Sequence, residues 1–272
     1  MAQSMAAVLE AMQRADEHHL YGSLAPLYAF VYDRHFDYDD QLAVVREAVD
    51  GARREARHDD AGTASADATA VLEAGCGHGG LLERLSGTFD DVVGVDIRPE
   101  MADMARERAP AATVLVGDVA SVCLDRRFDA VVMLGRVLPH ARTDEAAVDL
   151  LSNCATHLHP GGMIVFNTFD IRGFEPGRVT EDSFESDAYR VERRMESFMT
   201  DRDAGLWGFE ATYELTDRET GETGVAEETM HLRAHTPAEI EEYLDAVGFE
   251  RVEFLRESEF SLRAVATLGA RE

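Results

Sequence analysis

The hydrophobic residues of this chain follow more than one period. From residue 71 to residue 170, short apolar runs typical of strands take turns with amphipathic stretches of helical period. Strands that alternate with helices are joined by right-handed crossovers and form a parallel sheet. The pattern therefore predicts an α/β domain.

The first part of the chain shows helical period without strands. The stretches AAVLEAMQRA, LAPLYAFVYD and DYDDQLAVVREAVDGARREA each predict a helix. The small, polar segment 58–67 follows them and predicts a linker. We expect a helical cap with its linker over residues 1–66 and a core domain over residues 67–272.

A strictly alternating pattern appears between residues 173 and 235. The stretch LWGFEATYELT places its apolar side chains on one face, namely Trp207, Phe209, Ala211, Tyr213 and Leu215. Alternation of this kind is typical of a half-buried strand, and TDRETGETG predicts a hairpin turn after it. We expect an antiparallel β insertion at about residues 175–234.

The C-terminal part of the chain predicts one helix and two strands. Thr236, Pro237 and Glu239 are spaced as the N-cap, first and third residues of a helix, and Gly248 ends it. The runs FERVEFLRES and FSLRAVATLGA then predict an antiparallel pair of strands at the edge of the sheet.

The chain is strongly acidic. It has 53 acidic and 26 basic residues, a net charge of −27, and no lysine. The acids are spread along the chain instead of forming a block. We interpret this as adaptation to very high salt, where a hydrated acidic surface keeps a protein in solution, and we keep a cationic partner as the alternative.

Cysteine usage and hydropathy limit the cellular setting. Cys76, Cys123 and Cys154 form no C-x-x-C pair and no metal-ligand spacing, so we expect a reducing compartment and no metal site. No apolar run approaches the roughly 18 residues of a membrane span. The start of the chain carries acids, unlike a signal peptide. We expect a cytoplasmic protein, either monomeric or homodimeric, that does not enter membranes.

The segment 71–80, VLEAGCGHGG, carries the strongest functional signal. Glycines at every second position allow a tight turn from strand to helix and bring backbone N–H groups close to a ligand. A nucleotide-like cofactor is therefore expected over residues 73–80. The same residues satisfy G-x-G-x-x-G, so a dinucleotide is an alternative.

Later motifs follow in a recognisable order. A second strand ends in Asp96, a third in Gly117-Asp118, a fourth continues into MLGRVLPH, and a Pro-Gly-Gly turn precedes the fifth. With them the chain resembles the class I S-adenosylmethionine (SAM) dependent methyltransferases, strongly over residues 68–172 and moderately over 235–270. The resemblance implies a Rossmann-like, mostly parallel seven-stranded sheet with helices on both faces.

The resemblance also implies which residues bind SAM. Asp96 would accept hydrogen bonds from the ribose hydroxyls, and Asp118 from the adenine amino group. The full set of expected cofactor residues is Tyr28, Glu73, Gly75, Cys76, Gly77, Gly79, Asp96, Ile97, Asp118, Val119 and Leu134.

The run 133–140 is similar to the Leu-Gly-Asn-Ser-x-x-His run of glycine N-methyltransferase and its small-molecule relatives. Arg136 stands where that run has Asn, so glycine specificity does not transfer. Arg136 is instead a candidate for binding an acidic acceptor through a bidentate fork. His140 is a candidate general base, or it only lines the pocket.

Tyrosines of the N-terminal helices are candidates for a lid. In similar methyltransferases such residues close over the cofactor, where an aromatic face lies beside the sulfonium. We expect this of residues 18–35, with Tyr28 towards the cofactor and Tyr32 towards the acceptor. The alternative is that these aromatic side chains are plain core.

The acceptor follows by elimination. The run after the fourth strand lacks the Asn/Asp-Pro-Pro-aromatic and Pro-Cys signatures of base methylation, and a chain without lysine cannot hold a K-D-K-E set. With no basic, aromatic RNA-binding module, no nucleic acid is expected. We expect methyl transfer to N, O or C of a small molecule. An NAD-dependent oxidoreductase and a non-catalytic SAM-binding protein are the alternatives.

Overall fold

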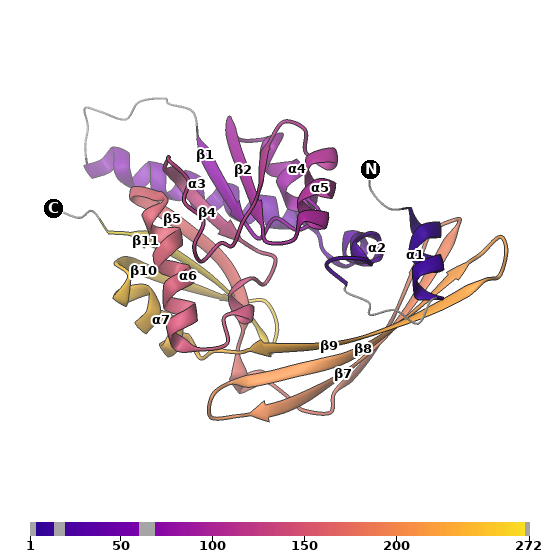
Figure 1. The fold of residues 1–272 in the computed structure, drawn as a ribbon. Coiled ribbons are helices and arrows are strands. Elements are labelled where there is room, and N and C mark those ends of the chain that lie inside the picture. The colour runs from indigo at the N-terminus through magenta and orange to yellow at the C-terminus, as the bar shows by residue number, and fades with distance from the viewer. Residues whose placement is uncertain (1–3, 14–19, 60–68, 270–272) are drawn as a thin grey trace.

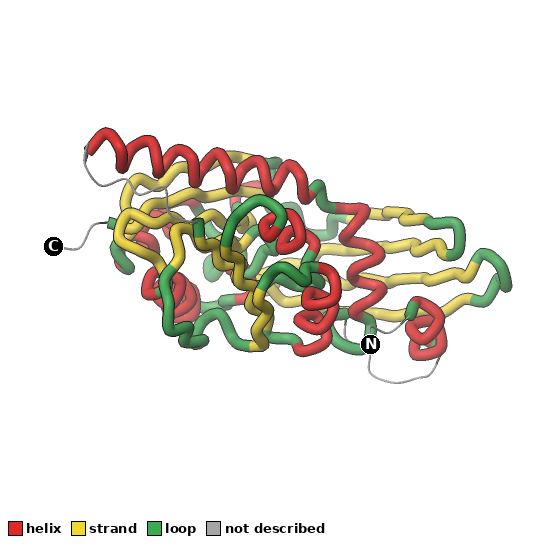
Figure 2. The backbone as a smooth tube through the Cα atoms, turned by 90° about the horizontal axis from the view of Figure 1, so that it is seen from above, coloured by secondary structure: helices red, strands yellow, loops and turns green. Residues whose placement is uncertain are grey.

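The computed structural model describes residues 4–13, 20–59 and 69–269. Figure 1 shows a core of helices on both sides of one sheet, and a second, narrower sheet that projects from it. Seen from above, helix α3 runs across the core while the strands of the second sheet extend beyond it (Figure 2).

The core sheet has seven strands in the order β10-β11-β5-β4-β1-β2-β3. Strand β11 runs antiparallel to both of its neighbours, and the β1, β2, β3, β4 and β5 pairings are parallel. The predicted fold, with its terminal antiparallel pair, is confirmed. The strands are β1 (Ala70–Ala74), β2 (Asp91–Asp96), β3 (Thr113–Val116), β4 (Phe128–Met133), β5 (Leu158–Phe169), β10 (Phe249–Arg256) and β11 (Ser261–Leu268).

Helices cover both faces of this sheet. Val71 packs with the side that carries α3 (Tyr38–Asp59), α4 (Gly80–Ser86) and α5 (Pro99–Arg108), while its neighbour Leu72 packs with the side of α6 (Asp144–Thr156) and α7 (Pro237–Ala246). Both faces of the strands are therefore buried, which explains their unbroken apolar runs. Between β3 and β4 the chain makes turns instead of a helix.

The N-terminal helices divide between the two sheets. Helices α1 (Met5–Met12) and α2 (Ala25–His35) pack on the second sheet, with Val8, Leu27 and Val31 fully buried there. Helix α3 packs on the core sheet through Val45 and Val49. The segment expected to form a single cap thus joins the two parts. Most of the expected linker lies outside the described residues.

The second sheet is an antiparallel meander in the order β6-β7-β8-β9. The predicted hairpin turn lies between β8 and β9, and the apolar face of β8 points inward as expected. We call this the inner face of the sheet. The strands are β6 (Val179–Glu185), β7 (Tyr189–Asp201), β8 (Leu206–Asp217) and β9 (Thr223–Arg233).

The end of β9 joins the second sheet to the core. Arg233 is buried and forms ion pairs with Asp144 (2.6 Å) and Glu239 (3.2 Å), at the starts of α6 and α7. Glu239 also closes the predicted capping box with Thr236. Arg233 is the buried partner of both pairs, so removing the carboxylates would leave its charge buried and unpaired, which is costly. These contacts hold the second sheet beside the carboxyl ends of the parallel strands.

No helix in the described part of the chain is long and apolar enough to cross a membrane.

The two remaining elements are short 3-10 turns, η1 (Leu138–His140) and η2 (Ile171–Gly173), which follow strands β4 and β5.

Packing of α5 against the turn after β1 generates a stability prediction. Gly79 has φ of 84°, and a Cβ there would lie 2.8 Å from the Cα of Ala105. Gly221, in the β8–β9 turn, has φ of 75° with open space around it. Both Gly→Ala changes should cost about 1–2 kcal/mol for the left-handed backbone. Gly79→Ala should lower the unfolding free energy by roughly 1–3 kcal/mol more, because it overpacks. Equal losses in urea denaturation would contradict this.

Candidate active site

The turn after β1 is shaped by glycines in left-handed conformation. Gly75 and Gly77 have φ of 76° and 53°, where a side chain is strained. A Cβ on Gly75 would lie 2.3 Å from Cγ2 of Val137, whereas the space beside Gly77 is open. The chain can therefore approach the β4 loop closely at Gly75 and leave room for a ligand at Gly77.

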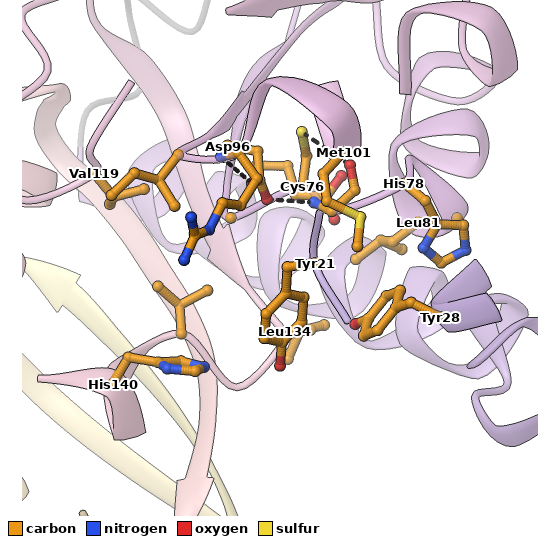
Figure 3. A pocket seen from close by; sticks show the side chains of 18 of the residues that line it. Tyr21, Tyr28, Cys76, His78, Leu81, Asp96, Met101, Val119, Leu134 and His140 are labelled. Atoms are coloured by element: carbon orange, nitrogen blue, oxygen red, sulfur yellow. Dashed lines mark hydrogen bonds between the residues drawn. The ribbon is translucent and has the colours of Figure 1, made fainter. Parts of the chain in front are cut away.

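Asp96 ties this turn to the end of β2. Its carboxylate accepts hydrogen bonds from the backbone N–H of Gly77 (2.8 Å) and of Arg98 (2.8 Å), both drawn as dashes in Figure 3. The side chain is 9% exposed, and burial raises its pKa although these bonds oppose the rise. Each oxygen keeps a lone pair. Asp96 therefore binds the backbone at the turn and before α5, and it can still accept hydrogen bonds from a ligand.

Glu73 is a buried carboxyl group beside the turn. It is 5% exposed, and its Oε2 has no hydrogen-bond partner among the described residues. Burial, and then the charge of Asp96, raise its pKa well above the ordinary range. A buried acid without a partner is costly unless a ligand satisfies it. Such a carboxyl suits an ammonium group, such as that of the methionine part of SAM.

A cavity of about 560 Å³ opens over these residues, and we call it the first chamber. Figure 3 shows Asp96, Val119 and His140 around it, with Tyr28 beside His78. Of the expected cofactor residues, all but Gly79 line it, namely Tyr28, Glu73, Gly75, Cys76, Gly77, Asp96, Ile97, Asp118, Val119 and Leu134. Gly79 instead packs against α5.

One end of the first chamber has the shape expected for an adenine site. Ile97 is 59% exposed there, and Val119 is buried. Asp118 is exposed, and its Oδ1 accepts the N–H of Ala120. An apolar side chain beside acceptor groups can hold a flat, donor-bearing ring.

Asn167, on β5, fixes the loop that follows β4. Its amide donates to the carbonyl of Leu134 (2.9 Å) and its Oδ1 accepts the N–H of Arg136 (2.9 Å). Arg136 is held at φ of 60°, which is rare for a side-chain-bearing residue. The two bonds from Asn167 therefore hold Arg136 in this strained backbone conformation.

Tyrosines of the α2 region form the wall opposite β4. The rings of Tyr21, Tyr28 and Tyr32 follow one another at centroid distances of 5.2 and 4.2 Å. Tyr21 and Tyr28 line the first chamber, whereas Tyr32 does not. Tyr28 and Tyr32 also pack on the second sheet, as the core interpretation expects, and the lid role stays a prediction.

Asp33 fastens α2 over the turn. Its carboxylate contacts His78 (2.8 Å) and Arg108 (2.6 Å), which belong to the turn and to α5. Partial burial would raise the pKa of Asp33, but hydrogen bonds from these two partners outweigh it and lower the pKa. Residues 18–19 of the expected lid lie outside the described residues.

His140, in η1, stands between two cavities. The residue is accessible from both chambers, and the protein that surrounds it lowers the pKa of its imidazole by burial. The ring of Tyr21 meets it edge-on at 6.2 Å. A neutral imidazole at this place can accept a proton.

A second cavity of about 270 Å³ adjoins the first, and we call it the second chamber. It lies between the loops after β4 and β5 and the inner face of the second sheet. Six residues line both chambers, namely Tyr21, Tyr28, Phe36, Gly135, His140 and Met230. Tyr32 and Arg136, expected on the acceptor side, both line the second chamber.

The second chamber is positively charged. Arg136, Arg178 and Arg193 line it together with the carboxylate of Glu175, and Arg193 is already paired with Asp182 (2.6 Å). In the described part of the chain no carboxylate forms an ion pair with Arg136, whose guanidinium lies 4.5 Å from the centroid of the Phe169 ring. The pKa of His35 is lowered by burial and then by the charges of Arg193 and Arg136. This chamber therefore suits an anionic group.

The residues present fit SAM as a cofactor. Glu73 offers a buried acceptor, Asp96 a second one, and Gly77 an open backbone approach, all facing a chamber large enough for a nucleoside. Within residues 4–13, 20–59 and 69–269 no cluster of three or more His, Cys, Asp or Glu side chains is placed to hold a metal ion.

Comparison with known proteins agrees with this geometry. The Methyltransferase domain family matches residues 71–162. The dTDP-3-amino-3,4,6-trideoxy-alpha-D-glucopyranose N,N-dimethyltransferase of Streptomyces venezuelae is 30% identical over 190 residues, which are 70% of this chain and 78% of that protein. The chain belongs to the SAM-dependent methyltransferase family. SAM is its methyl donor and its acceptor is a small molecule, so neither the NAD-dependent nor the non-catalytic alternative is retained.

Other relatives extend the comparison to most of this methyltransferase. The dTDP-3-amino-3,6-dideoxy-alpha-D-glucopyranose N,N-dimethyltransferase of Streptomyces fradiae is 29% identical, over 86% of each chain. The crystal structure of Streptomyces venezuelae DesVI covers 90% of this chain and 97% of its own, with a TM-score of 0.76 and 24% identity. SAM-bound CalS10 from Micromonospora echinaspora covers 93% and 98%, with a TM-score of 0.73 and 22% identity. These two structures show the same fold.

Several residues of the site carry no local sequence signal. Tyr38 and His78 enter the first chamber from α3 and from the turn, and Arg193 enters the second from β7. Glu228, on β9, is the exception. Glu228, Met230 and Leu232 are two residues apart and so share one face of the strand. The sequence alone therefore places an acid on an apolar face, which is a sign of a functional residue.

Asp96 generates a binding prediction. Asp96→Ala should weaken binding of S-adenosylhomocysteine by about 1–3 kcal/mol, because N–H groups of the turn and the ligand hydroxyls lose their acceptor. Asp103→Ala removes an exposed carboxylate from α5 and should leave binding unchanged. Calorimetry measures both. If folded Asp96→Ala binds S-adenosylhomocysteine with an unchanged dissociation constant, Asp96 does not bind the cofactor.

Proposed function

We propose that this methyltransferase methylates the amino group of an amino sugar attached to a nucleotide. The observation that carries the proposal is the second chamber, which is lined by arginines in a protein of net charge −27 and adjoins the cofactor site at His140. Phosphate groups suit such a chamber, because arginine binds them through two parallel hydrogen bonds.

The names of the relatives support the same acceptor class. The relatives from Streptomyces venezuelae and Streptomyces fradiae are both N,N-dimethyltransferases of dTDP-linked amino sugars. A third, from Saccharopolyspora spinosa, is a dTDP-4-amino-2,3,4,6-tetradeoxy-D-glucose N,N-dimethyltransferase and is 30% identical over 42% of this chain. The likeness of residues 133–140 to glycine N-methyltransferase stays a prediction.

The residues of the shared wall account for the chemistry. When bound, SAM supplies an electrophilic methyl carbon whose bond to sulfur breaks with the electron pair left on sulfur. His140 takes the proton that the acceptor nitrogen must lose, and the tyrosine wall excludes water. Arg136, with Arg178 beside the same chamber, holds the anionic end, so that the nitrogen meets the methyl group in line.

Mass spectrometry tests the proposal directly. The protein, SAM and dTDP-3-amino-3,6-dideoxy-α-D-glucose should yield a product heavier by one or two methyl groups, and NAD should not bind. If the protein binds S-adenosylhomocysteine but methylates no nucleotide-linked amino sugar, the acceptor class is wrong.

Arg136 should determine acceptor affinity. Arg136→Gln removes a buried, charge-assisted contact and should raise KM for the nucleotide-linked acceptor roughly 10- to 100-fold, with little change in kcat or in S-adenosylhomocysteine binding. Arg202→Gln, at an exposed turn outside both chambers, is the matched control. A KM that moves equally in both variants would speak against an anion site at Arg136.

We also propose that the protein is adapted to high salt. The 53 acids exceed the 26 bases by 27, so at least that many carboxylates repel without a basic partner. Dilution from molar to about 0.1 M salt lengthens the Debye length from about 3 to about 10 Å. The melting temperature should therefore fall on dilution. A flat or rising melting temperature, followed by circular dichroism, would favour a cationic partner instead.

A further inference from the structure

Glu228 is an acid on the inner face of the second sheet. On β9 it shares that face with Ala226, Met230 and Leu232, and across the sheet its neighbour on β8 is Ala211. It lines the first chamber but not the second. Its carboxyl group thus reaches the cofactor side of the site. None of the other inner-face residues named on β9 is basic, so none of them can pair with it.

The carboxyl group of Glu228 is only partly satisfied. The backbone N–H of Leu20 donates to it, but its Oε2 is buried and has no hydrogen-bond partner in the described ranges. Burial raises the pKa of Glu228 to about 7. Orphaned buried oxygens are rare in folded proteins, and each calls for a partner that a ligand or an ordered water can supply.

Charge on the inner face is ordered from one edge to the other. Glu228 lies on β9, whereas Arg193 lies on β7, two strands away and one inward-facing position along. The spacings of a sheet put their backbones about 12 Å apart. Arg178 and Arg136 lie on the Arg193 side, in the second chamber. The acid therefore lies near the cofactor, and the basic side chains lie beyond it, where Arg193 is paired with Asp182 (2.6 Å) and Arg136 and Arg178 come from neighbouring loops.

We propose that Glu228 binds the ammonium group of the acceptor and so decides which end of a two-ended acceptor faces the methyl donor. This rests on the proposed function, in which the acceptor carries an amine and an anion. The ammonium ion brings N–H donors and a charge to the unpartnered Oε2, and the phosphate end then falls towards the arginines. Glu228 is a positioning and specificity residue, and His140 remains the proton acceptor.

An alternative role is purely structural, because the Leu20 bond alone would hold the α2 region against β9. Glu228→Gln separates the two roles. It has the same shape and keeps an oxygen that can accept the Leu20 N–H, but it has no charge to pair with a cation. Glu227→Gln removes a carboxylate from the exposed, outer face of the same strand and is the matched control.

The first measurement does not depend on the acceptor. Sinefungin is a SAM analogue in which a carbon bearing an amino group replaces the methylated sulfur. Its ammonium group therefore takes the place of the methyl group, which the acceptor nitrogen approaches. In Glu228→Gln the affinity for sinefungin should fall roughly 10- to 100-fold relative to that for S-adenosylhomocysteine. The ratio should stay unchanged in Glu227→Gln. Parallel weakening of both ligands in Glu228→Gln would show a structural role and overturn the proposal.

The second measurement compares two acceptor-like probes, dTDP-3-amino-3,6-dideoxy-α-D-glucose and its hydroxyl counterpart dTDP-6-deoxy-α-D-glucose. The wild-type protein should bind the amine more tightly, and Glu228→Gln should lose roughly a factor of ten or more of that preference. Retained preference overturns the role of Glu228 while the proposed function stands. If neither probe binds but the sinefungin ratio falls, the sugar-nucleotide acceptor is wrong and the ammonium site stands.

Discussion

The active site depends on the carboxylate of Asp96. A parallel sheet brings the ends of β1 and β2 side by side, and Asp96 joins the turns that follow them through the N–H groups of Gly77 and Arg98. The backbone N–H groups of Gly75 and Cys76 also bond to the carbonyl of Val95, so the turn is held against the end of β2 at several points. The glycines let the turn come close to the loop after β4, and Asp96 fixes the conformation of the turn. Glu73 and the chamber above it therefore have a defined shape.

The second sheet turns an open sheet edge into two chambers. Arg233 pairs with Asp144 and Glu239 at one end of β9, and Trp207 packs edge-on against Phe169 (4.8 Å between ring centroids). This junction sets the inner face opposite the loops after β4 and β5. The second sheet brings Glu228 to the first chamber and Arg193 to the second chamber, where the loop after β4 adds Arg136.

The site keeps groups that a core optimised for stability would not. The pKa values of Glu73, Asp96 and Glu228 are all raised by burial, and Arg136 sits in a strained backbone conformation that Asn167 fixes. Ligands that bring an ammonium, hydroxyls or a phosphate would relieve these costs. Buried acids and a strained backbone conformation that occur together at one place are typical of a functional site.

The sequence by itself determined the core sheet, the terminal strand pair and the β insertion, and it predicted the residues from Glu73 to Leu134 that line the first chamber, because each depends on a local period or on a motif at one strand end. It did not determine that Gly79 packs against α5 rather than lining the chamber, or that α3 joins the core while α2 covers the site. Nor did it join Glu228, Tyr21 and Arg193 to His140. These residues lie far apart in the chain and meet only because β9 is anchored across the carboxyl ends of the parallel strands, and no local pattern records a contact between two sheets.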